Sequence, residues 1–347
     1  MINILELESS KGFGGQEHRT QRVINGLDKQ KFKVFYGLNK GSTSFTKDID
    51  CEFVEFDLRK VYNIFEIIKI CRFVKKNDIK IISTHSGKDG IIGSIVGKIC
   101  KVKVIRTRHL QTPISSAMSY NLCTKVVAVS NATKCSLISK GVKENLIDVI
   151  YTGVDTNKFN PNFKKDIKKE LNLASDIIVI GIVAVLRGAK NHKLLINAFN
   201  ELSLENCALV IVGDGPQEDH LKEITKDSKN IFMLGNRTDV VDFMGSFDIF
   251  VLPSKMEALG TVLLEAGSCA VPCIGSNVGG IVEAILDNKT GFIFNLDNKE
   301  ELKNAIFKLV QDKGLRYKFG KNAREYVDNN FSIEQMVKKT EILYETI

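Results

Sequence analysis

Short apolar runs and longer amphipathic stretches alternate along this chain, and the alternation starts twice. Each run has the length of a buried strand, and each stretch spaces its apolar residues as a helix does. Strands that alternate with helices pair in parallel, and their sheet needs helices on both faces. The expected strands are residues 2–7, 33–36, 52–56, 79–83, 102–106 and 126–129, then 177–185, 208–212, 231–234, 249–252, 271–274 and 291–294. Helices are expected at 16–27, 61–76, 90–99, 118–123 and 132–140, then at 193–203, 218–225, 240–244, 261–269, 278–286 and 299–312.

The segment between the two series is predicted to be a linker. Residues 151–161 are rich in turn-forming types, and a charged helical stretch is expected at 162–171. A chain of 347 residues is also long enough for two domains. We therefore predict two doubly wound, Rossmann-like α/β domains at 1–155 and 156–331, with a last helix at about 332–347 that packs back on the first. Such domains bind ligands outside the carboxyl ends of their strands, where they face each other.

Composition excludes several classes of protein. Apolar residues make up 44% of the chain and charged residues 26%, which excludes a mostly disordered protein. The longest apolar run, residues 177–186, is too short for a membrane span. The first eight residues carry acids where a signal peptide needs a basic region, so we expect a cytoplasmic protein. The eight cysteines form no CxxC or Cys/His cluster, which favours reduced thiols over a metal site or disulfides.

Positive charge is concentrated in the first half of the chain. Residues 1–151 hold 25 Lys and Arg against 14 Asp and Glu, a net of +11, whereas residues 152–347 hold 24 against 27, a net of −3. A basic half suits nucleic acid, an anionic membrane face or an acidic glycolipid. Trp is absent, and aromatic residues do not interleave the lysines as a stacking platform for single strands requires, so we expect no nucleic acid. The basic, apolar stretch 59–76 either rests on the cytoplasmic face of a membrane or packs its apolar stripe on the sheet.

The strongest local motif is Pro253-Ser-Lys-Met-Glu-Ala-Leu-Gly-Thr-Val-Leu-Leu-Glu-Ala-Gly-Ser268. A strand ends before it, and a helix is expected to begin near Gly260. The first backbone N–H groups of a helix have no intrahelical partners, so Thr261 and Val262 can donate to a diphosphate. Glu257 would lie in the strand-end loop, and Glu265, one turn into the helix, would reach a ribose. The alternative is that both glutamates are solvated surface acids.

Several motifs together resemble a known family. They are the Glu-x7-Glu element from Glu257 to Glu265, Val271-Pro272, Gly279-Gly280-Ile-Val-Glu283, Gly14-Gly15, Val127-Ala-Val-Ser-Asn131, Tyr151-Thr-Gly-Val-Asp155 through Phe159, Val212-Gly-Asp-Gly-Pro216 and Thr290-Gly-Phe292. In this order and spacing, they resemble the retaining glycosyltransferases of family 4, also called glycosyl transferases group 1. That resemblance covers most of the chain, and it implies the GT-B architecture of two Rossmann-like domains facing across a cleft.

The resemblance also implies how a nucleotide-sugar donor is held. Gly14 and Gly15 would form a tight turn whose backbone approaches the donor phosphates, and Lys190 would neutralise the diphosphate. Glu257 would contact the sugar hydroxyls, and Glu265 would hold the ribose. The other implied donor-binding positions are Gly213, Gly215, Asn236 and Arg237 around the base, and Leu259, Gly260, Thr261 and Val262 at the helix start.

One basic position departs from the family pattern. Val185 stands where the family has an arginine five residues before the lysine, so either Arg187 replaces that arginine or Arg187 faces solvent. A second departure is Ala270, where a glycine is usual. It removes no charge and leaves the implied site unchanged.

Histidines are the remaining candidates for substrate contact. His109 ends a strand and matches the family's histidine that faces the transferred sugar, although a strand-end histidine is often only a polar loop residue. His85, His18 and Arg108 are candidates for the acceptor side.

Two other motifs do not fit the sites that they resemble. Gly12-Phe-Gly-Gly15 lacks the third glycine of a dinucleotide loop. Asp48-Ile-Asp50 spells the metal-binding DxD of the other glycosyltransferase fold class, but it lies in a short charged loop without that context. We therefore expect no metal and no cofactor, because the nucleotide sugar is a substrate.

The implied reaction breaks a sugar–diphosphate bond and transfers the sugar to an acceptor hydroxyl. Glu257, Lys190 and His109 are the implied catalytic residues, and positive potential from Lys190 and the helix start would stabilise the leaving diphosphate without a metal. Retention follows from the resemblance alone. The expected acceptor is a glycan or lipid-linked glycan of a bacterial-type cell envelope, as in lipopolysaccharide, capsule or glycolipid assembly.

Two alternatives stay open at this point. A sugar-nucleotide 2-epimerase of similar fold would need further carboxylates in the first domain. Glu6, Glu8 and Glu17 are available there, but their context reads as strand and helix surface. A non-catalytic nucleotide-sugar-binding protein is the second alternative.

Overall fold

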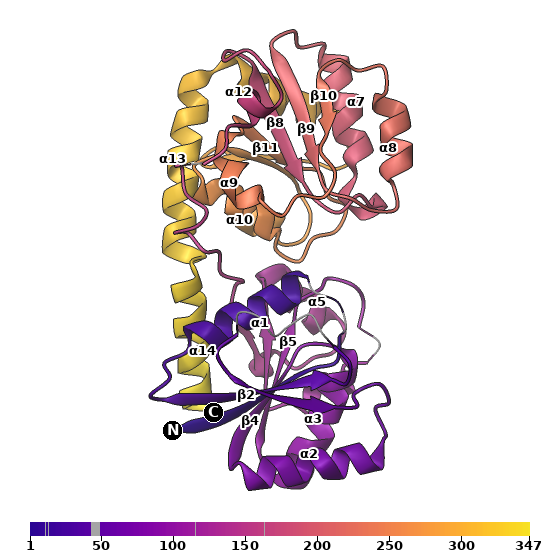
Figure 1. The fold of residues 1–347 in the computed structure, drawn as a ribbon, viewed down its shortest axis with the longest axis vertical. Coiled ribbons are helices and arrows are strands. Elements are labelled where there is room, and N and C mark those ends of the chain that lie inside the picture. Colours follow the sequence, from indigo (N-terminus) through magenta and orange to yellow (C-terminus); the bar gives the residue numbers. More distant parts are fainter. Residues whose placement is uncertain (11, 13, 43–48, 115, 163) are drawn as a thin grey trace. The chain divides into compact units, whose positions relative to one another are not determined.

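A computed structural model of the chain describes residues 1–347 except 11, 13, 43–48, 115 and 163. Two compact units are present: a first unit of Met1–Gly153 with Ile333–Ile347, and a second unit of Val154–Ser332. Each unit carries one parallel sheet with interleaved helices (Figure 1). The predicted fold class, two doubly wound α/β domains, is therefore confirmed.

The sheet of the first unit has the strand order β3-β2-β1-β4-β5-β6-β7. Its strands are β1 (Ile2–Glu8), β2 (Phe32–Asn39), β3 (Glu52–Phe56), β4 (Ile79–Thr84), β5 (Lys103–Arg108), β6 (Lys125–Ala128) and β7 (Ile147–Val149). All neighbouring strands pair in parallel. Strands β1, β4 and β5 are therefore adjacent, and their carboxyl ends lie at the same edge of the sheet.

Helices cover both faces of this sheet (Figure 1). They are α1 (Gly15–Gly26), α2 (Ile64–Lys76), α3 (Gly87–Cys100), α4 (Met118–Asn121), α5 (Asn131–Ser139), the 3₁₀ turn η1 (Glu144–Leu146) and α14 (Ile333–Thr346). The last of these, α14, packs into the core that α1 and β2 share, where Tyr344 meets Phe32 with ring centroids 6.0 Å apart. The Tyr344 hydroxyl donates to Glu6 of β1 over 3.1 Å. The end of the chain thus closes over a carboxylate of a central strand.

The sheet of the second unit has the order β10-β9-β8-β11-β12-β13, again parallel. Its strands are β8 (Ile178–Val183), β9 (Cys207–Val212), β10 (Ile231–Met233), β11 (Ile249–Leu252), β12 (Cys273–Ser276) and β13 (Gly291–Phe294). Its helices are α6 (Ile167–Glu170), η2 (Gly188–Lys190), α7 (His192–Leu202), α8 (Glu218–Thr225), α9 (Val240–Phe243), η3 (Met244–Ser246), α10 (Thr261–Ser268), α11 (Ile281–Ala284), α12 (Lys299–Gln311) and α13 (Lys313–Asn330).

Four elements differ from the sequence prediction. The charged stretch at 162–171 forms only the short helix α6, because the backbone N–H groups of Lys164 and Lys165 donate to the carbonyl oxygen of Asp242 instead of continuing a helix. The predicted helix at 278–286 shortens to α11, which Ile285 ends in an extended conformation. Strand β7 and the 18-residue helix α13 were not predicted, since β7 has three residues and α13 buries few apolar side chains.

Candidate active site

An ion pair lies at the carboxyl edge of the second unit's sheet. The ammonium of Lys190, at the end of η2, lies 2.5 Å from the carboxylate of Glu257, in the loop after β11. Both side chains are largely buried, and the backbone N–H of Lys255 donates to the carbonyl oxygen of Ala189, which joins the two loops. A partly buried charge is costly unless it is paired. This pair therefore keeps both charges in place, and it offers a cation for an anionic ligand and a carboxylate for hydroxyl groups.

Helix α10 begins beside this pair. Its N-cap residue, Gly260, has the left-handed conformation with φ 80°, and Thr261 and Val262 follow as the first helical residues. Their backbone N–H groups lie in the first turn of the helix, where a backbone N–H has no intrahelical carbonyl oxygen to donate to. Leu259 is buried behind the loop, and Glu265 is half-buried one turn into the helix.

The loop after β12 supports the backbone around Glu257. The backbone N–H of Gly280 donates to the Glu257 carbonyl oxygen over 3.1 Å. A Cβ added at Gly280 would lie 2.2 Å from the carbonyl oxygen of Ala258, which is too close for any side chain. Glycine at this position therefore allows the contact that fixes the Glu257 loop.

The loop after β9 lies against the loop after β8. Gly213 and Gly215 have φ values of 139° and 147°, and a Cβ added at Gly213 would lie 2.1 Å from the carbonyl oxygen of Ala184. Arg187, the N-cap residue of η2, is exposed, as is Val185, which stands where the family has arginine. Only Lys190 of the two basic candidates is thus held beside Glu257 by a contact that the structure describes.

Arg237 is engaged within its own unit. Its guanidinium donates to Glu170 and to both carboxylate oxygens of Asp239, and it stacks 5.0 Å above the Phe243 ring. These carboxylates raise the pKa of Arg237. Asn236, the neighbouring candidate, donates to Asp214 over 3.1 Å. Arg237 can therefore line a base pocket as a fixed planar group, but it is not a mobile charge.

In the first unit, Gly14 and Gly15 start helix α1. The carboxylate of Glu17 accepts from the backbone N–H of Gly14 over 2.8 Å. A Cβ added at Gly15 would meet none of the described atoms within 4 Å, so internal packing does not require glycine there. His18 follows on the exposed side of α1.

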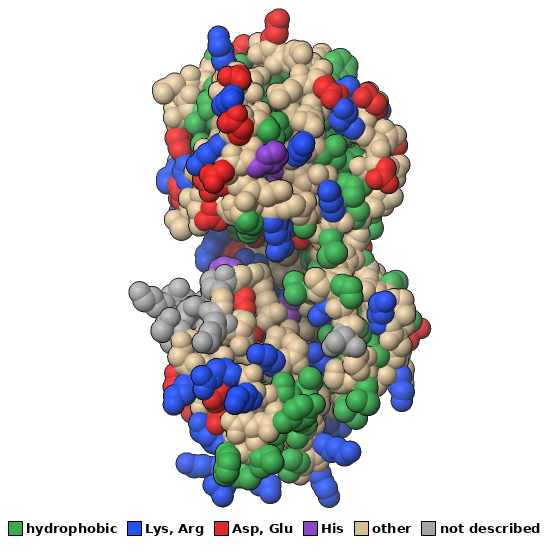
Figure 2. Space-filling model, turned by 90° about the vertical axis from the view of Figure 1, so that its right-hand side faces the viewer, with side chains coloured by type: hydrophobic (Ala, Val, Ile, Leu, Met, Phe, Trp, Pro, Cys, Tyr) green, Lys and Arg blue, Asp and Glu red, His purple; other side chains and the backbone are tan. Residues whose placement is uncertain are grey.

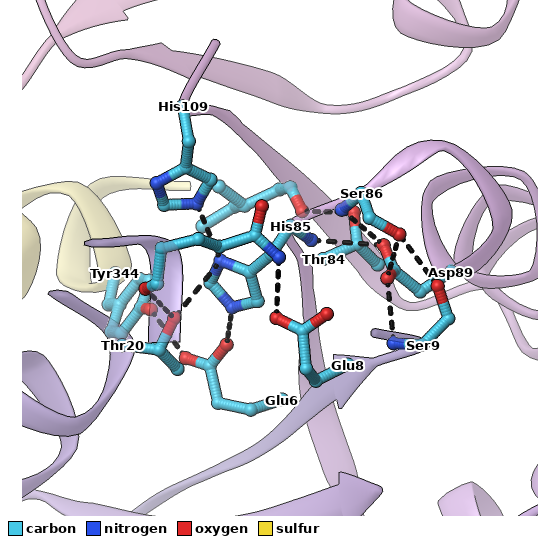
Figure 3. Close-up of polar contacts among 12 residues, drawn as sticks. Glu6, Glu8, Ser9, Thr20, Thr84, His85, Ser86, Asp89, His109 and Tyr344 are labelled. Carbon is cyan, nitrogen blue, oxygen red and sulfur yellow. Dashed lines mark hydrogen bonds and ion pairs between the residues drawn. The ribbon is translucent and has the colours of Figure 1, made fainter. Parts of the chain in front are cut away.

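A chain of buried polar contacts crosses the carboxyl ends of β1, β4 and β5 (Figure 3). Glu6 Oε2 lies 2.7 Å from His85 Nε2, and His85 Nδ1 lies 3.2 Å from His109 Nε2. Glu6 and His85 are 1% and 6% exposed, whereas His109 is half-buried. Arg108, next to His109, donates to Thr112 in its own loop.

These positions correct one expectation. Glu6, Glu8 and Glu17 were expected on strand and helix surface, yet all three are buried. Glu6 and Glu8 are buried because β1 lies between two other strands and beneath α1 and α14, and Glu17 because its carboxylate turns back to the backbone N–H of Gly14. His85, a candidate for the acceptor side, is buried with its ring against His109. Two glutamates in the apolar run of a central strand are the signal that would have revealed this cluster.

A second carboxylate cluster flanks the first. Asp89, near the start of α3, accepts from the backbone N–H groups of Ser9, His85 and Ser86. Burial, together with the charge of Asp89, raises the pKa of Glu8 to about 7. The side-chain amide of Gln16 donates a hydrogen bond to the Glu8 carboxylate over 2.7 Å.

Within the part of the chain that the structure describes, no group of three His, Cys, Asp or Glu side chains is placed to hold a metal ion. Asp48 of the DxD motif lies outside the described residues, and Asp50 pairs with Lys29 over 3.6 Å.

Known proteins match this chain along most of its length. Residues 13–158 match the family model of Glycosyltransferase Family 4, and residues 163–326 match that of Glycosyl transferases group 1. The UDP-Gal:alpha-D-GlcNAc-diphosphoundecaprenol alpha-1,3-galactosyltransferase of Escherichia coli is 30% identical over 303 residues, which are 80% of this chain and 78% of that protein. The capsular polysaccharide biosynthesis glycosyltransferase CapM of Staphylococcus aureus is 26% identical over 314 residues, 84% of this chain and 83% of that protein. The structure of a glycosyltransferase from Rickettsia africae ESF-5 matches with a TM-score of 0.90 at 25% identity, covering 99% of this chain and 98% of that one.

The packing of Gly280 leads to a prediction about stability. Gly280→Ala should lower the free energy of unfolding of the second unit by roughly 1–3 kcal/mol, because the added methyl group must displace the backbone at Ala258. Gly188→Ala is the matched control, since a Cβ there meets only the Gln217 side chain at 3.8 Å. Thermal unfolding of both variants checks this, and equal stability of Gly280→Ala and the parent chain would contradict it.

Proposed function

This chain belongs to the group 1 glycosyl transferases of family 4, and on that basis we propose that it transfers a sugar from a nucleoside-diphosphate donor to an acceptor hydroxyl with retention of configuration. The observation that carries the proposal is the Lys190–Glu257 pair, at 2.5 Å, beside the first turn of α10. A nucleotide sugar presents an anionic diphosphate next to sugar hydroxyls. Those are the two chemical groups that this cation and this carboxylate suit.

In the proposed reaction, Lys190 and the N–H groups of Thr261 and Val262 hold the diphosphate. Glu257 accepts hydrogen bonds from hydroxyls of the sugar, and Glu265 accepts them from hydroxyls of the ribose. The loop from Gly213 to Gly215 lies along the base, and Arg237 lies beyond that loop. The bond between the anomeric carbon and the phosphate oxygen breaks, and the nucleoside diphosphate leaves as an anion. The acceptor oxygen bonds to the anomeric carbon and gives its proton to the leaving phosphate. Preorganised positive groups stabilise the charge that develops on that phosphate.

Attack from the same face as the leaving group gives retention. An inverting transfer or a glycosidase mechanism relies on a carboxylate base or nucleophile on the opposite face of the sugar. Glu257 is the single carboxylate proposed beside the sugar, and its pairing with Lys190 supports a binding role. The family assignment also favours transfer over a sugar-nucleotide 2-epimerase or a non-catalytic binding protein.

Relatives suggest the kind of acceptor. The name of the matching Escherichia coli protein includes a diphosphoundecaprenol-linked acceptor. The name of the matching Staphylococcus aureus protein includes capsular polysaccharide biosynthesis. We infer that this chain also extends a lipid-linked glycan in cell-envelope assembly. Release of nucleoside diphosphate from a panel of nucleotide sugars, measured with and without a GlcNAc-diphospholipid, tests this. Release that depends on the acceptor supports the proposed transfer. Release of the nucleotide without transfer of the sugar, or no release at all, contradicts the proposed transfer.

A lipid-linked acceptor requires the enzyme to reach a membrane, and α2 is the surface that we propose for this contact. Ile70, Cys71 and Val74 of α2 pack on the sheet. The opposite side carries exposed apolar side chains, with Phe65 86% and Ile64 68% exposed. Figure 2 shows hydrophobic side chains gathered beside lysine and arginine at the lower edge of the first unit, where Figure 1 places α2.

Basic groups adjoin this apolar surface. A cavity of about 640 Å³ lies at the amino ends of β4 and β5, and its lining includes the four lysines Lys75, Lys80, Lys101 and Lys103. Lys75 belongs to α2, so the cavity borders this helix, and Asp78 and Glu345 also line it. Each basic group near an anionic bilayer contributes about 1 kcal/mol of binding free energy. The apolar side chains strengthen the binding further by inserting into the bilayer. None of the helices in the described ranges is long and apolar enough to span a bilayer, so the proposed contact is peripheral.

We predict that Glu257→Ala lowers turnover by about 10²-fold or more while the far-UV circular dichroism stays that of the folded parent. The variant removes the proposed sugar contact and leaves Lys190 without its partner. Glu300→Gln, at an exposed acid of α12, is the matched control and should keep full activity. Sugar transfer by Glu257→Ala at the parent rate would show that the site is misassigned.

Turnover should survive EDTA, because Lys190 and the helix N–H groups are proposed to neutralise the diphosphate in place of a cation. The measurement is the initial rate with and without chelator, followed by added Mg²⁺ or Mn²⁺. A rate abolished by EDTA and restored by either cation would refute metal independence and return attention to Asp48 and Asp50.

The membrane proposal predicts co-sedimentation with anionic liposomes at low salt, weakened at high salt because attraction is screened over roughly 8 Å at physiological ionic strength. Replacing Ile64, Phe65 and Ile68 together by serine should abolish sedimentation. The control replaces Phe307 and Tyr317, exposed apolar residues of the second unit, and should sediment like the parent. Equal binding to neutral and anionic lipid, or no binding at low salt, would remove the membrane claim.

A further inference from the structure

The contacts that join Glu6, His85 and His109 have no part in the donor scheme above, yet they end at the residue expected to face the sugar. Glu6 Oε2 to His85 Nε2 is 2.7 Å, and His85 Nδ1 to His109 Nε2 is 3.2 Å. The second oxygen of Glu6 accepts from the Tyr344 hydroxyl over 3.1 Å. Both ring nitrogens of His85 are therefore engaged, and each contact restricts where its protons lie.

With Glu6 ionised, a proton on each ring nitrogen of His85 satisfies all of its partners. An ionised Glu6 only accepts, so His85 Nε2 carries a proton. The hydroxyl of Thr20 donates to the Gln16 carbonyl oxygen over 3.1 Å, so at 3.4 Å its oxygen can only accept from His85 Nδ1. His85 with both protons is an imidazolium, and it forms a buried ion pair with Glu6.

The charges around the cluster agree with this assignment. Burial alone would raise the pKa of Glu6, but the hydrogen bond and charge of His85 outweigh it and lower that pKa. Burial opposes protonation of His85, but Glu6, followed by Glu8 and Asp89, raises its pKa. Burial, followed by the charges of His85, Arg19 and Arg108, holds the pKa of His109 well below its ordinary value. The titratable and charged groups that face the two histidines are Glu6 and Glu8 of β1, Arg19 of α1, Asp89 of α3, Arg108 of β5 and Tyr344 of α14.

We propose that the Glu6–His85 ion pair fixes His109 in the tautomer that carries its proton on Nδ1, so that His109 donates this N–H to an oxygen of the bound nucleotide sugar. The one proton on His85 Nδ1 is shared between the Thr20 oxygen at 3.4 Å and His109 Nε2 at 3.2 Å, so His109 Nε2 accepts and carries no proton. The other ring nitrogen of His109 points away from His85 (Figure 3). Glu6 and His85 are thus positioning residues, and the inference about the ligand rests on the proposed function.

The pair also acts as a switch. When pH rises through the pKa of His85, its remaining proton stays on Nε2, facing Glu6, and Nδ1 becomes an acceptor. His109 then donates from Nε2, and its outward Nδ1 loses the proton. The group that faces the ligand changes from donor to acceptor, so we expect sugar transfer to fall on the alkaline side of its pH profile.

Imidazole ¹⁵N NMR of the full chain tests the tautomer without any substrate. The five histidines are assigned by single substitutions. At pH 7 we expect His85 doubly protonated and His109 neutral with its proton on Nδ1, and His109 should change tautomer when His85 titrates. In Glu6→Gln, the pKa of His85 should fall by at least about one unit. A proton on His109 Nε2 in the parent at pH 7, or an unchanged His85 pKa in Glu6→Gln, would overturn the proposal.

Glu8→Gln is the matched comparison, because Glu8 is a buried carboxylate of the same strand with a pKa near 7. It should lower the pKa of His85 less than Glu6→Gln does, and the reverse order would overturn the role of Glu6. In the transfer assay, the alkaline limb of kcat/KM should move to lower pH in Glu6→Gln. An equal loss at every pH would mean that Glu6 only supports the fold. Absence of transfer by the parent chain would instead count against the proposed function, and the NMR result would still decide the tautomer.

Discussion

Parallel pairing throughout both described sheets decides where chemistry can occur in this protein. Every strand of a parallel sheet ends at the same edge, and each following helix begins there, so loop side chains and free helix N–H groups collect at that edge. The same edge collects residues from distant parts of the chain in each unit. They are Lys190, Gly213, Glu257 and Gly280 in the second unit, and Gly14, His85 and His109 in the first.

Each unit carries a largely buried charged pair at this edge, Lys190 with Glu257 and Glu6 with His85, and the two pairs differ in what they can do. Lys190 and Glu257 are largely buried but border the surface, so a ligand can separate them. In the proposed function, the diphosphate takes Lys190 and leaves the Glu257 carboxylate for sugar hydroxyls, so neither charge is left unpaired. Glu6 and His85 are buried completely enough that no ligand reaches them. In the proposed arrangement, their pair acts through the orientation of His109.

The sequence predicted the parts of this site that local pattern specifies. Apolar runs located most strands within a few residues, and the turn from Gly260 into Thr261 marked the start of α10. The buried cluster was missed because burial of Glu6 depends on strand order and on α14, which comes from the other end of the chain. Helix α13 was missed because its sequence is polar and its few buried apolar residues pack mainly on α10 and on β13, which lie far from it in the sequence.

The direct test of the central claim, that ligand chemistry belongs to the carboxyl edge of the second sheet, is hydrogen exchange of the full chain with a panel of UDP-, GDP- and ADP-sugars. We predict that at least one of them slows amide exchange at least about tenfold in residues 188–190, 213–215 and 257–265, because a bound ligand suppresses local opening. Residues 79–80 and 101–103, at the opposite edge of the first sheet, should be unchanged. Protection confined to those residues, or no protection by any member of the panel at millimolar concentration, would contradict the claim.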